Sequence, residues 1–260
     1  MTPLDLVAQA AMRLGGQASA RADGSFLLHL EVQHSDGSRD RYQLRVQAHG
    51  TRISAREETP ALLPSFCPER HINLDGTFCL YFHEAQPLDV TDDDSATAWA
   101  ETLWTFLRLQ RRAERLGRWP NNHTWAHGDA ALHQMRAATA AESFGRPTQN
   151  RVAEGRLSVQ HVRIKQRDVF RVMDGAVHLF SVWGQGPRLI GKRKPCWCDS
   201  KESRKGRRIG RCADHAEQAA QLAISLHRWA QEEEDFWRRI GDRTCCGRCN
   251  KCRLQGQASR

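Results

Sequence analysis

The sequence predicts an α+β fold built in two parts. A helix-type pattern near the start is followed by segments in which apolar and polar residues alternate, and then by further helix-type segments. Residues 1–150 carry 15 Lys and Arg against 18 Asp and Glu, a net charge of −3, whereas residues 151–260 carry 24 against 12, a net charge of +12. Seven of the nine cysteines also lie in the second part. We therefore expect one domain over residues 1–145 and a basic, cysteine-rich region over residues 150–260.

Length and composition favour a soluble protein of the cytoplasm. The 260 residues are enough to bury a sizeable hydrophobic core. No apolar run approaches the ~20 residues that span a bilayer, and the first residues lack the basic start and apolar core of a signal peptide. We therefore expect no membrane contact, and clustered cysteines that bind metal rather than form disulfides.

The first helix has signals at both ends. Thr2 is placed to cap it, Pro3 suits its first turn, and Asp5 completes the spacing of a capping box. Gly15 can end it, because glycine adopts the left-handed conformation common after a helix.

Strand-type segments come next. Apolar residues alternate over residues 26–32 and again over residues 42–46, and the turn at residues 35–38 joins them into a half-buried β-hairpin. A third short strand is expected to start near Thr51. Residues 59–80 contain three prolines and should be mostly irregular.

Two helices complete the first part. Ser95 can cap the first of them, the aspartates at residues 92–94 suit its positive end, and Gly117 can close it. A loop at residues 119–128 leads to a second helix within residues 130–144.

The second part begins after a Gly-Arg-Pro-Thr boundary at residues 145–148. Strand-type segments follow, with a hairpin signal at Asp174-Gly175, so a β-hairpin region is expected at about 156–185. A cysteine-rich module should occupy about 190–255, with a long helix at roughly 213–240 between its two cysteine clusters.

Cys79, in the stretch HINLDGTFCLYF at residues 71–82, is the candidate nucleophile. A cysteine thiolate attacks acyl groups and holds them as a reactive thioester. Little positive charge lies beside Cys79, but transfer between thioesters needs less thiol activation than attack on an amide. Asn73, six residues upstream, carries a neutral amide suited to oxyanion stabilisation. The alternative is that Cys79 is a small buried residue that acts only as a hydrophobic side chain. Cys67 lies in no motif, and we expect a buried or incidental thiol there.

The segment HINLDGTFCL resembles the active-site segment of ubiquitin-conjugating enzymes, in which a His-Pro-Asn tripeptide precedes a glycine and then the catalytic Cys-Leu. The expected order of elements is similar too. The WP and WAHG pieces within residues 119–128 resemble the bacterial branch of this fold, found in ubiquitin-like conjugation operons that include anti-phage systems. Ile72 replaces the proline, and the spacing from His71 to Cys79 is shorter than in the family. The resemblance covers residues 1 to about 145.

This resemblance implies a UBC-like domain that works as a conjugating enzyme. Cys79 would accept the C-terminal carbonyl of a ubiquitin-like protein from an activating enzyme and pass it to an amine of a target protein. Asn73 would stabilise the oxyanion, and His71 would brace the loop through backbone hydrogen bonds.

An attacking lysine also needs a group that helps to remove its proton, because its reference pKa is about 10.4. His83 and Asp89 are the candidates, beside the aspartates at residues 92–94, which also suit a solvated helix start. The role of His127 stays open, because a single histidine in a loop is more often structural than catalytic.

The first cysteine cluster has the spacing of a zinc site. Cys196-x-Cys198 is followed by Cys212-x2-His215, and three thiolates with one imidazole make a tetrahedral ligand set for Zn2+. The pattern resembles the SEC-C zinc motif, which begins with Pro-Cys-x-Cys and ends in Cys-Cys or Cys-His, although the spacing here is longer.

The second cluster comprises Cys245, Cys246, Cys249 and Cys252. It could bind a second zinc, combine with the first cluster, or hold an iron–sulfur cluster. Because Cys245 and Cys246 are adjacent, a purely local four-cysteine site is geometrically awkward. We expect one or two zinc ions with a structural role, since a full set of protein ligands leaves no open position.

A basic run lies around the first cluster, and it could contact nucleic acid, an acidic protein face or only solvent. Its members are Lys192, Arg193, Lys194, Lys201, Arg204, Lys205, Arg207, Arg208 and Arg211. The alternative function is therefore a zinc-containing nucleic-acid-binding protein with an inactive conjugating-enzyme-like domain. A third hypothesis is a thiol redox protein. It is weaker, because no second cysteine stands at C-x-x-C spacing from Cys79 to form a disulfide with it.

Overall fold

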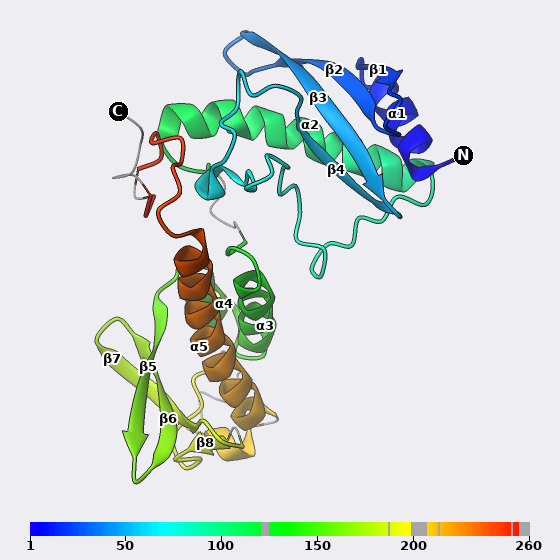
Figure 1. The fold of residues 1–260 in the computed structure, drawn as a ribbon. Coiled ribbons are helices and arrows are strands. Elements are labelled where there is room, and N and C mark those ends of the chain that lie inside the picture. The colour runs from blue at the N-terminus through cyan, green and yellow to red at the C-terminus, as the bar shows by residue number, and fades with distance from the viewer. Residues whose placement is uncertain (121–124, 187, 199–206, 213, 251, 255–260) are drawn as a thin grey trace. The chain divides into compact units, whose positions relative to one another are not determined.

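The computed structural model describes residues 1–120, 125–186, 188–198, 207–212, 214–250 and 252–254. The chain forms two compact units, of which the first comprises residues 1–121 and 242–260 and the second residues 122–241 (Figure 1). The chain therefore leaves the first unit and returns to it. The expected boundary at residues 145–150 lies inside the second unit; as a division into domains it stays a prediction.

The first unit has a helix, an antiparallel sheet and a helix in the predicted order, whereas the second helix expected to complete the first part, within residues 130–144, lies in the second unit. α1 (Pro3–Arg13) is followed by four antiparallel strands in the order β1-β2-β3-β4, and then by α2 (Asp93–Leu116). The strands are β1 (Gln17–Ala20), β2 (Phe26–Gln33), β3 (Arg39–His49) and β4 (Arg52–Glu57). The hairpin and the strand after Thr51 are confirmed. The sequence does not predict β1, because its four residues include no large apolar side chain.

Helix ends follow the sequence signals, with one correction. Thr2 caps α1, and Asp5 completes its capping box. Ser95 was expected to cap α2, but Asp92 does: its carboxylate accepts the N–H of Ser95 at 2.8 Å, while the Ser95 hydroxyl accepts the N–H of Asp92 at 3.1 Å. Ser95 is thus the third residue of the helix in a capping box. Gly117 ends α2 with φ 61°, as predicted.

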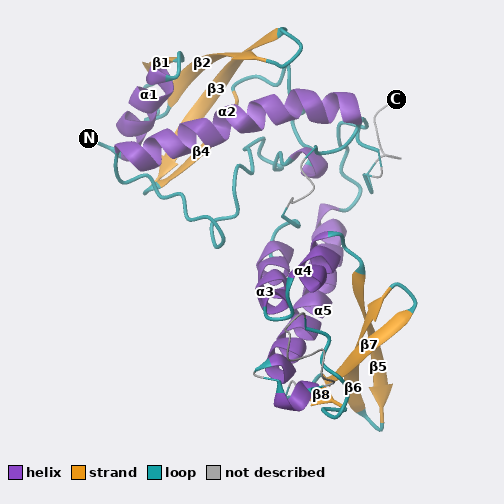
Figure 2. Ribbon diagram, turned by 180° about the vertical axis from the view of Figure 1, so that it is seen from behind, coloured by secondary structure: helices purple, strands orange, loops and turns teal. Residues whose placement is uncertain are grey.

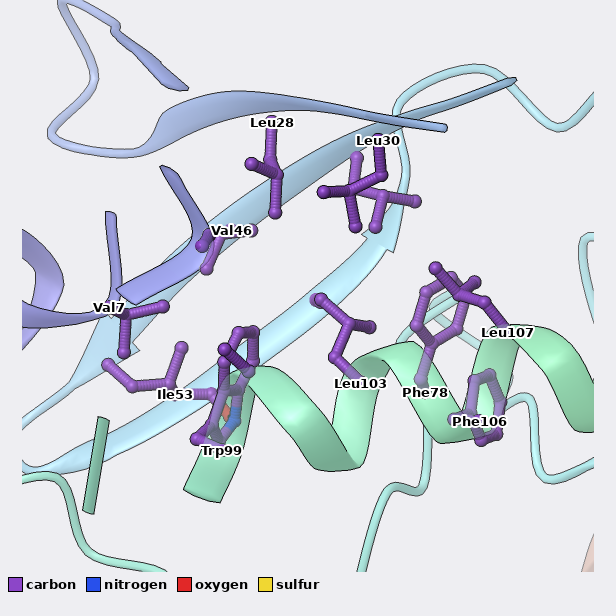
Figure 3. Close-up of a cluster of buried hydrophobic side chains, with 14 of the residues drawn as sticks. Val7, Leu28, Leu30, Val46, Ile53, Phe78, Trp99, Leu103, Phe106 and Leu107 are labelled. Carbon is purple, nitrogen blue, oxygen red and sulfur yellow. The ribbon is translucent and has the colours of Figure 1, made fainter. Parts of the chain in front are cut away.

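The core of the first unit lies between α2 and one face of the sheet. Figure 3 shows side chains of α2, among them Trp99 and Leu103, directed toward strand residues such as Leu28 and Val46. All four are at most 1% exposed. Trp99 also donates its indole N–H to the carbonyl of Ile53 at 3.2 Å, so its one polar group is satisfied in the core. Burial of each such side chain contributes roughly 1.5–3 kcal/mol.

The second unit is an antiparallel meander next to helices (Figure 2). The strands are β5 (Leu157–Ile164), β6 (Arg167–Asp174), β7 (Val177–Trp183) and β8 (Arg188–Ile190). The helices are α3 (Ala130–Glu142), α4 (Arg146–Ala153) and α5 (His215–Ile240), and α5 contacts α3 and all four strands. The hairpin at Asp174-Gly175 and the long helix are confirmed, whereas α4 and β8 were not expected. No helix in the described part of the chain is long and apolar enough to cross a membrane.

Candidate active site and metal centres

The irregular segment after β4 contains a small hydrogen-bonded unit. Cys67 pairs with Ile72 as an isolated antiparallel bridge, and Ile72 pairs in turn with Phe78. The short helix η1 (Pro68–Arg70) spans the first bridge. The N–H of Phe78 donates to the carbonyl of Ala55 at 2.8 Å, which connects this unit to β4.

His71 connects this unit to Cys79. The carbonyl of His71 accepts the N–H of Cys79 at 2.8 Å, and the N–H of His71 donates to the carbonyl of Pro68 at 2.8 Å. Its backbone is left-handed, with φ 55°, a conformation that non-glycine residues rarely adopt. The imidazole packs edge-on against Trp119 at 4.8 Å between ring centroids. Backbone and ring contacts together fix the peptide that positions Cys79.

Cys79 differs from every other cysteine in its exposure. All nine cysteines are described, and Cys79 alone is exposed, while seven are buried and Cys246 is partly buried. This finding contradicts the alternative of a buried hydrophobe. Although the residue is exposed, enough protein surrounds its thiol for desolvation to raise the pKa of Cys79 above its ordinary value.

Asn73 begins the turn that precedes Cys79. Its carbonyl accepts the N–H of Gly76 at 3.0 Å, and its N–H donates to the carbonyl of Thr77 at 2.8 Å. The side-chain amide donates to the Thr77 hydroxyl at 3.0 Å. A primary amide carries two N–H groups, and this hydrogen bond uses one. The structure thus places Asn73 in the exposed loop of Cys79, with its side chain oriented by Thr77.

The two candidates for amine activation lie together. His83 Nε2 is 3.6 Å from Asp89 Oδ2, and Asp89 Oδ1 accepts the hydroxyl of Thr51 at 2.7 Å. The Nδ1 of His83 is buried and has no hydrogen-bond partner within the described residues. His127 belongs to the second unit, where its Nδ1 is 2.7 Å from Glu233 Oε1, and this contact accounts for it structurally.

Arg70 and Gln110 form a buried polar contact that the sequence analysis missed. Arg70 is 2% exposed and Gln110 is 0% exposed. The Nε of Arg70 donates to Gln110 Oε1 at 2.8 Å, and Nε2 of Gln110 donates to the carbonyl of Arg70 at 2.6 Å. These bonds join η1 to α2. The sequence carries one signal for this contact: Gln110 stands on the apolar face of α2, where a buried amide without a hydrogen-bond partner would be costly.

The structure brings together the four predicted ligands of the first metal centre: Cys196, Cys198, Cys212 and His215. Their ligand atoms all lie within 4.8 Å of one another, and all four residues are buried. The Sγ of Cys196 is 3.1 Å from His215 Nδ1, and the Sγ atoms of Cys198 and Cys212 are 3.8 Å apart. A tetrahedral zinc ion with Zn–S bonds of ~2.3 Å places its sulfurs about 3.8 Å apart. The cluster is therefore compatible with a zinc ion.

Local backbone contacts assemble this first centre. The N–H of Cys196 donates to the carbonyl of Arg207 at 2.9 Å, so its two cysteine-bearing segments pair with each other. η3 (Ile209–Arg211) precedes Cys212, and His215 is the first residue of α5. The ring of Phe144 packs against the ring of His215 at 5.1 Å between centroids.

A second cluster forms in the first unit, and it includes Cys67. The Sγ of Cys67 lies 3.3 Å from that of Cys246, 3.6 Å from Cys249 and 3.8 Å from Cys245, and Cys252 lies 3.6 Å from Cys245. The sequence predicted a buried or incidental thiol at Cys67; the residue is buried, and the structure places it beside cysteines of the second cluster. Hydrogen bonds from the thiols of Cys245, Cys249 and Cys67 lower the pKa of Cys246, whereas hydrogen bonds with Cys245, Cys246 and Cys249 raise the pKa of Cys67, so these thiols titrate as a group.

Part of the basic run forms an exposed surface around the first metal centre. Its described members, all exposed, are Lys192, Arg193, Lys194, Arg207, Arg208 and Arg211. Lys201, Arg204 and Lys205 lie outside the described residues. This surface can attract an anionic partner.

Comparison with known protein families matches both parts of the chain. Residues 15–121 match a family model described as the prokaryotic E2 domain, and residues 126–254 match one described as a cysteine-rich domain C-terminal to the E2 domain. Cys79 and Cys67 fall within the first match, and the other seven cysteines within the second. No curated protein and no solved structure matches the chain.

Proposed function

Because the chain consists of a prokaryotic E2 domain followed by a cysteine-rich C-terminal domain, we propose that it carries a ubiquitin-like protein as a thioester on Cys79 and transfers it to an amine of a target protein. An E2 domain implies, in general, an activating enzyme and a ubiquitin-like protein as partners. The observation that carries the proposal is that Cys79, alone among the nine cysteines, is exposed, on a backbone that His71 holds.

Charging is an exchange between two thioesters. The thiolate of Cys79 attacks the carbonyl carbon of the thioester between the activating enzyme and the ubiquitin-like protein. A new C–S bond forms at Cys79, the C–S bond to the activating enzyme breaks, and the departing thiolate takes up the proton that Cys79 has lost. A raised pKa of Cys79 is tolerable here, because the leaving group is itself a thiol.

Transfer is the attack of an amine on the Cys79 thioester. An amide bond forms, the C–S bond breaks, and the thiolate of Cys79 leaves. Asn73 would donate its second amide N–H to the oxyanion of the tetrahedral intermediate. His83, which lies 3.6 Å from Asp89, would accept the proton of the amine and return it to the thiolate or to solvent.

The distribution of lysine supports a target amine outside the E2 domain. No lysine precedes Lys165 in the sequence, so residues 1–164 offer no lysine ε-amine to the thioester. The arginines that replace lysine are guanidinium groups, which stay protonated and do not attack thioesters. The E2 domain can therefore hold an activated carbonyl without consuming it on its own side chains.

The cysteine-rich domain would supply a structural zinc centre and a docking surface. Cys196, Cys198, Cys212 and His215 fit one zinc ion with no open position, which excludes a catalytic water there. We assign the exposed basic surface around this centre to the recruitment of a target or partner. The setting we propose is a conjugation system of the bacterial cytoplasm, of the kind that includes anti-phage operons, in which a neighbouring gene encodes the activating enzyme.

A charging assay tests the proposal. The protein is mixed with the activating enzyme and the ubiquitin-like protein encoded nearby, with ATP and Mg2+, and run on non-reducing gels. We expect a thiol-sensitive adduct with the wild type, none with Cys79→Ala, and an undiminished adduct with Cys212→Ala, which lies in the other unit. If the activating enzyme becomes charged and this protein does not, the proposal fails. Salt-dependent binding of RNA or DNA would then favour the alternative of a nucleic-acid-binding protein.

A further inference from the structure

We infer that Cys67 of the E2 domain and three cysteines at the end of the chain form a second zinc site, which fastens the C-terminal segment to the loop of Cys79. The C-terminal segment is defined here as residues 242–254. The ligands are Cys67, Cys245, Cys246 and Cys249. The site stands on the geometry alone, whereas its effect on charging rests on the proposed function.

Three of the four sulfurs already lie in range of one ion, and the fourth is next to them. The sulfurs of Cys67, Cys245 and Cys246 all lie within 4.8 Å of one another. The Sγ of Cys249 lies 3.6 Å from that of Cys67 and 3.8 Å from that of Cys246, so a shift of Cys249 toward Cys245 completes the set. A zinc ion with four Zn–S bonds of ~2.3 Å requires about 3.8 Å. Cys252 contacts only Cys245 within the cluster, at 3.6 Å, which makes it the weaker candidate for the fourth position. Disulfides, with S–S bonds of about 2.0 Å, do not fit these distances.

Contacts other than sulfur also hold the C-terminal segment on the first unit. The N–H of Asn250 donates to the carbonyl of Gly117 at 2.6 Å, at the end of α2. Arg248 forms an ion pair with Glu114 of α2. Leu254 is 3% exposed. Figure 1 shows this segment beside the C-terminal end of α2. The last part of the cysteine-rich domain is therefore packed on the E2 domain, where its cysteines can share an ion with Cys67.

Cys67 belongs to the same hydrogen-bonded unit as Cys79. The N–H of Cys67 donates to the carbonyl of Ile72 at 3.1 Å, and the N–H of Ile72 donates back at 3.0 Å. Ile72 is bridged to Phe78, the residue before Cys79, and His71 holds the N–H of Cys79. An ion bound at Cys67 would thus restrain the backbone of the nucleophile. The site would make the conformation of Cys79 depend on the end of the chain.

Metal analysis of the purified full-length protein tests the site without any conjugation partner. We expect two zinc ions per wild-type chain, one in Cys67→Ser, and two in both Cys252→Ser and Cys79→Ser. Cys198→Ser, which removes a ligand of the first centre, should hold one. Two zinc ions in Cys67→Ser, one in the wild type, or iron in place of the second zinc would each overturn the inference.

Hydrogen–deuterium exchange covers the case in which Cys67→Ser fails to fold. Wild-type protein is treated with a chelator until one or both zinc ions are lost, and Cys198→Ser serves as the form that lacks only the first centre. Loss of the second ion should raise exchange at residues 67–79 and 242–254 together, by at least tenfold, while β2 and β3 stay protected. Unchanged exchange at residues 67–79 after complete zinc removal would overturn the coupling. Because neither measurement involves charging, failure of the inference and failure of the proposed function remain distinguishable.

Discussion

Replacing Gln110 by alanine should destabilise the E2 domain and loosen the segment that leads to Cys79. The change removes the acceptor of the buried Arg70 Nε and the donor to the Arg70 carbonyl, at 2.8 and 2.6 Å. A hydrogen bond to a charged group contributes about 1.5–3 kcal/mol and a neutral one about 0.5–1.5 kcal/mol, so the expected loss of stability is about 2–4.5 kcal/mol. The bond from Arg70 to the main-chain carbonyl of residue 110 remains, which keeps the loss at the lower end of this range.

The assay is pulse-labelling hydrogen exchange at increasing urea on the full-length chain, read from peptides of α2. This readout follows the first unit separately from the second, so the two transitions are not averaged. Arg112→Ala, an exposed change two residues away on the same helix, is the control and should stay within about 0.5 kcal/mol of the wild type. If Gln110→Ala matched Arg112→Ala, the Arg70–Gln110 contact would not stabilise the fold, and its role in holding η1 would be refuted.

Two further predictions concern Cys79 and the end of α2. Because desolvation raises the pKa of Cys79, its alkylation by iodoacetamide should accelerate about tenfold per pH unit between about pH 6.5 and 8.5, as the thiolate fraction grows. Peptide mass spectrometry measures the rate. A rate that stops rising near neutral pH would show that the thiolate is already formed there and that the pKa is not raised. Gly117→Ala should destabilise the first unit by about 1 kcal/mol more than Gly50→Ala, because both positions have φ above +60° but only at Gly117 would a Cβ meet the Asn250 side chain, which then has to change its rotamer. Equal losses in urea unfolding would mean that the Asn250 side chain does not pack on Gly117.

Local signals explain which elements could be predicted from sequence. The cap of α1, the hairpin between β2 and β3, and the end of α2 depend on residues within a few positions of each other, so their patterns are visible in the chain. The error at the start of α2 has the same origin, because Asp92 and Ser95 are both good capping residues and form one capping box. The sequence also could not distinguish a boundary from a helix start at residues 145–148, since a glycine two residues before a proline is compatible with both. The structure begins α4 there, with the proline in its first turn.

Long-range contacts explain what the sequence could not show. Cys67 is 179 residues from Cys246, and no spacing rule connects a cysteine in a proline-rich loop with one near the end of the chain. The same holds for Arg70 and Gln110, which lie 40 residues apart and meet only because α2 packs on the sheet. In contrast, Cys196, Cys198, Cys212 and His215 lie within 20 residues, and their spacing was sufficient to predict that they come together.

Cys79→Ser tests whether the sulfur of Cys79 is the atom that carries the proposed ubiquitin-like protein. A serine at this position would hold the same carbonyl as an oxygen ester, which thiols do not exchange because an alkoxide is a poor leaving group. Intact-mass analysis after charging should therefore show an adduct of the same added mass on wild type and Cys79→Ser, lost on thiol treatment only from the wild type. A thiol-sensitive adduct that persists on Cys79→Ser would place the thioester on another cysteine and contradict the account.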